Sequence, residues 1–134
     1  MQTEATFRSS AFNTSETKPY FINPYCFGDD LAKWMMARLR AIGLHTDDEP
    51  RQEDFGWYFQ FEVTAGQHCC VLGYQEGDPE GRWLVGLERS RGLVGSILGM
   101  RKRGIDTAAV QALQEILGTA PEIRELEWQD ASER

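Results

Sequence analysis

An alternating run of aromatic and polar residues near the middle of the chain restricts the possible folds most. Residues 57–64 place a large apolar side chain at every second position. A period of two is typical of a β-strand that buries one face. The apolar positions are Trp57, Phe59, Phe61 and Val63. The sequence therefore predicts a strand whose aromatic face lies against a second layer of structure.

Two more strands are predicted directly after this one. Residues 68–74 and 82–88 repeat the alternation, and turn-forming residues occupy 65–67 and 75–81. Connections this short join antiparallel neighbours. We therefore expect a three-stranded antiparallel meander at the centre of the fold.

The segment before the meander has the spacing of an amphipathic helix. Apolar residues in 31–42 recur every three or four positions. Asp29 or Asp30 is the expected N-cap, because a carboxylate can accept a hydrogen bond from a free amide of the first turn. Gly43 is the expected residue after the helix, because glycine adopts a left-handed backbone without steric cost.

The remaining elements are predicted at the two ends of the chain. A weak strand is expected at 5–13, a second helix from an N-cap at Asp106 to Gly118, and a last strand at 123–128. Residues 89–104 could form a short helix, although three glycines weaken it. The order β-α-β-β-β-(α)-α-β predicts a single α+β domain over 1–134. We expect a two-layer sandwich, with a mainly antiparallel sheet and helices on one face.

Composition indicates a cytoplasmic protein that needs no disulfide or metal ion in order to fold. Cys26, Cys69 and Cys70 are an odd number without metal spacing, and neighbours on a strand cannot easily pair with each other. The sequence shows no secretory signal and no apolar run of the roughly 20 residues that span a bilayer. Neither His45 nor His68 belongs to a recognisable zinc pattern. We expect no metal and no cofactor.

Charge suggests a protein partner rather than nucleic acid. The net charge is −7, whereas nucleic-acid binding requires a basic surface. An acidic stretch and a basic island are the candidate binding regions, in a monomer or a homodimer. The acidic candidates are Asp47, Asp48, Glu49, Glu53 and Asp54, and the basic candidates are Arg89 and Arg91.

Residues 53–59, together with the meander through Trp83 and the Glu88–Arg89 pair, are similar to a group of small uncharacterised bacterial cytosolic proteins. The acidic α+β domain with tryptophan-rich strands also resembles immunity proteins of bacterial polymorphic toxin systems. The resemblance implies a non-catalytic protein-binding module that blocks a toxin. Two alternatives are an acidic dimer similar to secretion chaperones and an enzyme that uses Glu53 and Asp54 for acid–base chemistry.

Overall fold

The computed structural model describes residues 1–54, 56–77, 80–89 and 104–131. Within these ranges the chain forms two helices and seven strands. In chain order they are β1 (Glu4–Arg8), α1 (Asp29–Ala41), β2 (His45–Thr46), β3 (Arg51–Glu53), β4 (Gly56–Val63), β5 (Gly66–Gln75), β6 (Arg82–Arg89), α2 (Thr107–Gly118) and β7 (Arg124–Gln129).

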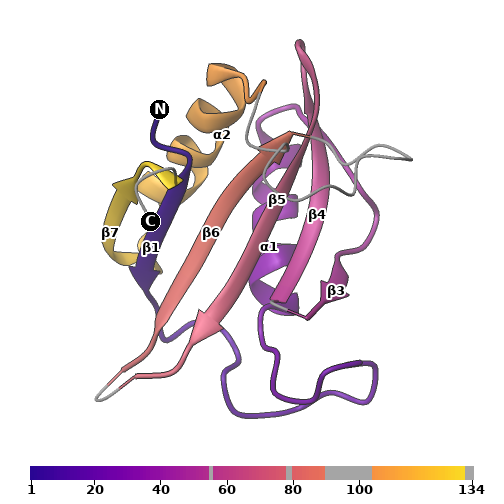
Figure 1. The fold of residues 1–134 in the computed structure, drawn as a ribbon, viewed down its shortest axis with the longest axis vertical. Helices are drawn as coiled ribbons and strands as arrows, with labels where there is room; N and C mark the ends of the chain where they lie inside the picture. The colour runs from indigo at the N-terminus through magenta and orange to yellow at the C-terminus, as the bar shows by residue number, and fades with distance from the viewer. Residues whose placement is uncertain (55, 78–79, 90–103, 132–134) are drawn as a thin grey trace.

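The strands form one antiparallel sheet. Its order is β2-β4-β5-β6-β1-β7, and β3 also pairs with β4. Figure 1 shows both helices behind this sheet. The two helices contact each other, and both contact β4. The predicted α+β architecture, an antiparallel sheet with helices on one face, is confirmed.

The predicted meander is β4-β5-β6. Val63 pairs with Gly66, so the first turn consists of residues 64–65 alone. The turn predicted at 65–67 was therefore placed too late, because Gly66 and Gln67 already belong to β5. The register pairs Phe59 with Cys70, as expected for strands whose apolar positions share one face.

The hydrophobic core lies between the helices and the inner face of the sheet. Complete burial of one large apolar side chain stabilises a fold by about 1.5–3 kcal/mol. The largest fully buried side chains come from strands and from both helices: Phe7, Phe59, Phe61, Trp83, Leu87, Leu31, Met35, Met36, Leu39, Leu113, Ile116 and Leu117.

The start of α1 differs from the prediction. Its N-cap is Gly28, which has no side chain to cap the helix, although the Asp30 carboxylate accepts a hydrogen bond from the Leu31 amide at 2.9 Å. Gly28 has φ 139°, and a Cβ atom there would lie 3.0 Å from Leu72 Cδ1 and 3.1 Å from Trp57 Cδ1. The positive φ favours glycine, and any larger residue would also force Leu72 or Trp57 to move by a few tenths of an ångström. Asp29 and Asp30 instead occupy the first turn, where negative charge interacts favourably with the helix dipole.

The other boundaries follow the predictions with small changes. Gly43 has the expected positive φ, 94°, and Asp106 caps α2 through a hydrogen bond from the Ala108 amide. The first strand ends at Arg8 rather than at residue 13, because the chain turns at Ser9, whose hydroxyl accepts a hydrogen bond from the Ala11 amide. The possible helix at 89–104 lies almost wholly outside the described residues.

All three cysteines are free thiols, as predicted, and Cys69 and Cys70 are buried. In the described ranges, no helix is long and apolar enough to cross a membrane.

Candidate functional site

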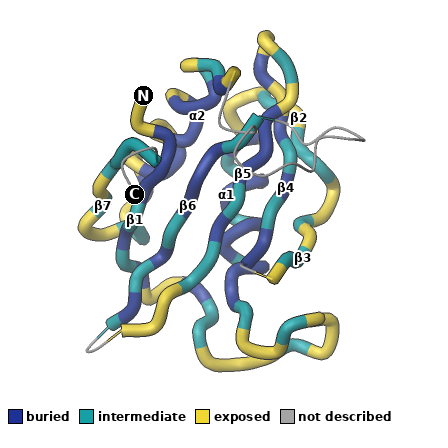
Figure 2. The backbone as a smooth tube through the Cα atoms, viewed as in Figure 1, coloured by how far each residue is buried: buried dark blue, intermediate teal, exposed yellow. Residues whose placement is uncertain are grey.

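The loop between β1 and α1 exposes apolar side chains. In the described part of the chain, five large hydrophobic residues are exposed, and three of them lie in this loop. Tyr20 is 55% exposed, Ile22 80% and Tyr25 83%. We call these three residues the loop surface. Figure 2 shows the mainly exposed loop at the bottom of the molecule. Exposed apolar groups gathered in one segment are typical of interaction sites.

Two buried aromatic residues fix this loop to the core. Phe21 and Phe27 are only 8% and 5% exposed. Their ring centroids lie 6.2 Å apart, and the Phe21 centroid lies 5.4 Å from that of Trp57, in edge-to-face arrangements. The loop therefore alternates between residues that anchor it and residues that it presents to solvent.

Hydrogen bonds from the sheet hold the loop backbone in place. The Gln52 side chain accepts from the Ile22 amide at 2.5 Å and donates to the Asn23 carbonyl at 3.0 Å. The Trp57 indole donates to the Cys26 carbonyl at 2.8 Å. A loop fixed in this way loses little conformational entropy when it binds a partner.

Carboxylates lie close to Tyr20, one of the three residues of the loop surface. The Tyr20 hydroxyl donates a hydrogen bond to Asp29, and this bond is the main cause that raises the pKa of Tyr20 to about 12. Burial and the negative charges of Asp29, Asp30 and Glu49 raise this pKa further. The Lys33 ammonium, 5.5 Å from the Tyr20 ring centroid, is a cation in the same neighbourhood.

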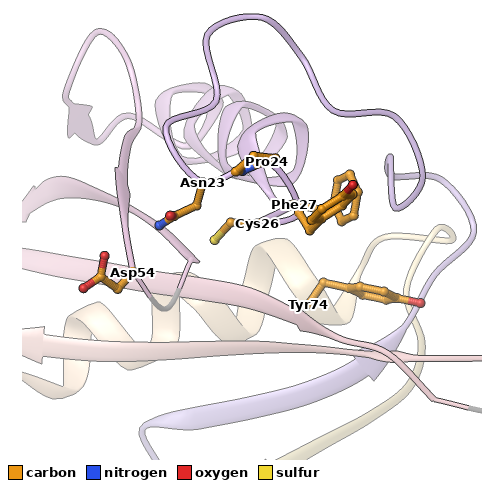
Figure 3. Close-up of a pocket in the computed structure, with 7 residues that line it drawn as sticks. Asn23, Pro24, Cys26, Phe27, Asp54 and Tyr74 are labelled. Carbon is orange, nitrogen blue, oxygen red and sulfur yellow. The ribbon is translucent and has the colours of Figure 1, made fainter.

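A cavity lies between the loop and the sheet. Its volume is about 410 Å³, and we call it the Cys26 cavity. Figure 3 shows residues from the loop on one side and Asp54 and Tyr74 on the other. The lining consists of Asn23, Pro24, Tyr25, Cys26, Phe27, Asp54 and Tyr74.

The thiol in this cavity is poorly suited to nucleophilic chemistry. Burial is the main cause that raises the pKa of Cys26, and the charge of Asp54 raises it further. A hydrogen bond with Gln52 acts in the opposite direction. The thiol is therefore protonated at neutral pH, whereas the thiolate is the reactive form.

The predicted acidic candidates separate into different environments. Asp47 is held within the fold, since its carboxylate accepts from the Gln60 amide at 2.8 Å and its carbonyl accepts from Arg40 at 2.6 Å. Asp48 is exposed beside a second cavity of about 290 Å³. Glu49 is exposed and contributes to the field around Tyr20.

The other two acidic candidates lie next to the Cys26 cavity. Glu53 is half-buried in β3 and pairs with Gly56. Asp54 is exposed and lines the cavity. The structure therefore brings Glu49 and Asp54 to the neighbourhood of one loop.

The basic candidates do not join this group in the described structure. The Arg89 guanidinium donates to the Ala65 carbonyl at 2.7 Å and to the Gly104 carbonyl at 2.9 Å. These contacts place Arg89 at the β4–β5 turn, at the far end of β4 from Asp54. Arg91 lies outside the described residues.

The two histidines also differ. His45 is exposed on β2, whereas His68 is fully buried and connects the β4–β5 hairpin to the start of α2. In the described ranges, no three His, Cys, Asp or Glu side chains are grouped so that they could hold a metal ion.

Sequence reasoning missed the loop surface. Residues 20–22 form a short apolar run between Pro19 and Pro24, which was the available signal. Composition alone cannot distinguish a buried Phe21 from an exposed Ile22, because packing against distant Trp57 decides between them.

Comparison with known proteins finds no matching family model, no matching curated protein and no matching solved structure. The loop surface and the carboxylates near it are therefore the features from which we infer a function.

Proposed function

We propose that this protein is a non-catalytic binding module that inhibits a partner protein, as immunity proteins of polymorphic toxin systems do. One observation carries the proposal: Ile22 and Tyr25 are almost fully exposed on a loop that Gln52 and Trp57 hold in place. Tyrosine is one of the residues that dominate binding energy at protein interfaces, and neighbouring contacts exclude water from around it.

The acidic surroundings indicate the chemistry of the partner. Asp29, Asp30 and Glu49 act on Tyr20, and Asp54 acts on Cys26, so carboxylates act at two points of the loop, with the Lys33 ammonium as a cation beside Tyr20. The net charge of the whole chain is −7. Such a field accelerates association with a basic surface and slows association with an acidic one. The partner proposed here is a protein with a basic face and an apolar pocket.

Affinity capture from a lysate of the source organism tests the proposal. The tagged wild type is compared with a double variant, Ile22→Ser with Tyr25→Ser, and with the control Ile42→Ser. Ile42 is also exposed, but it follows α1 and lies outside the loop. We expect the wild type and the control to retain one stoichiometric partner that the double variant loses.

The melting temperatures of all three proteins should agree, because exposed side chains contribute little to stability. A partner that the double variant binds as well as the wild type does would refute a role for the loop surface.

Oligomeric state separates this proposal from the secretion-chaperone alternative, for which an exposed apolar surface is also expected. Sedimentation equilibrium of the purified protein should give a monomer. A stable dimer that the Ile22→Ser, Tyr25→Ser variant dissociates would instead favour the chaperone alternative.

A further inference from the structure

We infer that the Cys26 cavity is a receptor for one arginine side chain of the partner, an inference that rests on the proposed function. The cavity adjoins the loop surface, since Tyr25 belongs to both. A partner that covers Ile22 and Tyr25 would therefore also reach the mouth of the cavity.

One end of the cavity suits the aliphatic part of an arginine. Figure 3 places Phe27 and Tyr74 on the same side of the Cys26 thiol. Phe27 is buried, and the Tyr74 ring packs against Trp83 with 4.9 Å between ring centroids. Both walls are therefore fixed and apolar. The methylene groups of arginine bury favourably along such surfaces.

The other end suits a guanidinium group. Figure 3 shows the Asp54 carboxylate and the Asn23 side-chain amide on the side away from the two rings. Among the described residues that line the cavity, Asp54 is the only charged one. Its two oxygens can accept parallel hydrogen bonds from the planar fork of arginine, which the single ammonium of lysine cannot supply.

The charge of the described lining disfavours an anionic occupant. Within the described part of the chain, an anion in the cavity would meet the Asp54 carboxylate and no lysine or arginine. Cys26 would remain a neutral thiol beside it, because burial disfavours the thiolate. A cation with an apolar stem satisfies both ends of the cavity.

The test uses N-acetyl-arginine methylamide as a probe, followed by NMR of the full-length protein without a partner. We expect saturable shifts of the Cys26 and Tyr74 resonances. The citrulline analogue, which has nearly the same shape without the charge, and the lysine analogue should each bind more weakly. Asp54→Asn should weaken binding of the arginine probe about fivefold, as expected for one partly exposed ion pair.

Asp48→Asn is the matched control, because Asp48 is an exposed acid that does not line the cavity. This variant should bind the arginine probe as the wild type does. Equal binding of the arginine and citrulline probes, equal losses in the two variants, or no shift at Cys26 and Tyr74 would each overturn the inference. Because the probe acts without the partner, such a failure leaves the capture experiment on the loop surface unaffected.

Discussion

The buried histidine His68 should make stability depend on pH. The His68 side chain is 0% exposed. Its Nε2 atom lies 3.0 Å from the Asp106 amide nitrogen, which donates to it, and its Nδ1 atom lies 3.1 Å from the Gly66 carbonyl oxygen. Nε2 must therefore lack a proton, and Nδ1 must donate. Protonation of His68 would place a proton on Nε2, so that two N–H donors, Nε2 and the Asp106 amide, would face each other at the start of α2.

The direction of the pH dependence follows from the surroundings of His68. Burial, the largest cause, lowers the pKa of His68 from its ordinary value of 6.5. The positive charge of Arg89 lowers this pKa further, whereas the hydrogen bond with Gly66 and the charge of Asp106 raise it. Just below the unfolded pKa, His68 therefore binds a proton in the unfolded chain while it stays neutral in the folded protein. The contribution of His68 to stability is complete above the unfolded pKa and is lost as the pH falls below it.

The unfolded-state pKa limits the size of the effect. At about pH 5.5, the unfolded histidine is protonated in a ratio of about ten to one, so the loss from His68 cannot exceed about 1.4 kcal/mol. Urea unfolding followed by tryptophan fluorescence at about pH 7.5 and about pH 5.5 measures this loss. We expect the wild type to lose more stability than His68→Gln, whose side chain does not titrate.

The control is His45→Gln, which replaces the exposed histidine on β2. This variant should show the same loss between the two pH values as the wild type. If His68→Gln loses as much stability as the wild type over this interval, the reasoning about His68 is wrong.

Two further predictions concern local structure. Asp106→Ala removes the carboxylate that accepts a hydrogen bond from the Ala108 amide at 2.9 Å. The midpoint of urea unfolding should therefore fall by an amount equivalent to about 1 kcal/mol, while the slope of the transition stays unchanged. An unchanged midpoint would show that the cap contributes nothing to stability. Gln52→Ala removes two hydrogen bonds to the loop, so hydrogen exchange of the Ile22 amide should become faster while exchange in α2 stays unchanged. Equal hydrogen-exchange rates of the Ile22 amide in variant and wild type would show that the Gln52 hydrogen bonds do not hold the loop in place.

The strands were predictable wherever many residues repeat one pattern. Phe59 and Phe61 lie in a long strand, and their alternation is visible without knowledge of the partner strands. The strands β2 and β3 were missed, because two or three residues cannot display a period. The N-cap of α1 was misassigned for another reason. Gly28 has a positive φ and lies close to Leu72, and this contact joins residues far apart in the sequence.

The candidate site was only partly predictable. The acidic character around Asp54 could be read from composition, whereas the exposure of Ile22 and Tyr25 depends on the burial of their neighbours Phe21 and Phe27. The hydrogen bond between His68 and Asp106 spans 38 positions in the sequence and has no local signature.

The most direct test of binding through the loop surface is to measure the binding kinetics of the captured partner with the wild type and with the Ile22→Ser, Tyr25→Ser variant, at low and high salt. We expect the dissociation constant of the variant to be at least about 30-fold higher, equivalent to the roughly 2 kcal/mol of an interface hot spot. We also expect association rates that fall with salt for both proteins, because the carboxylates remain. Equal dissociation constants, or association that salt does not slow, would contradict the proposal that this acidic loop binds a basic partner.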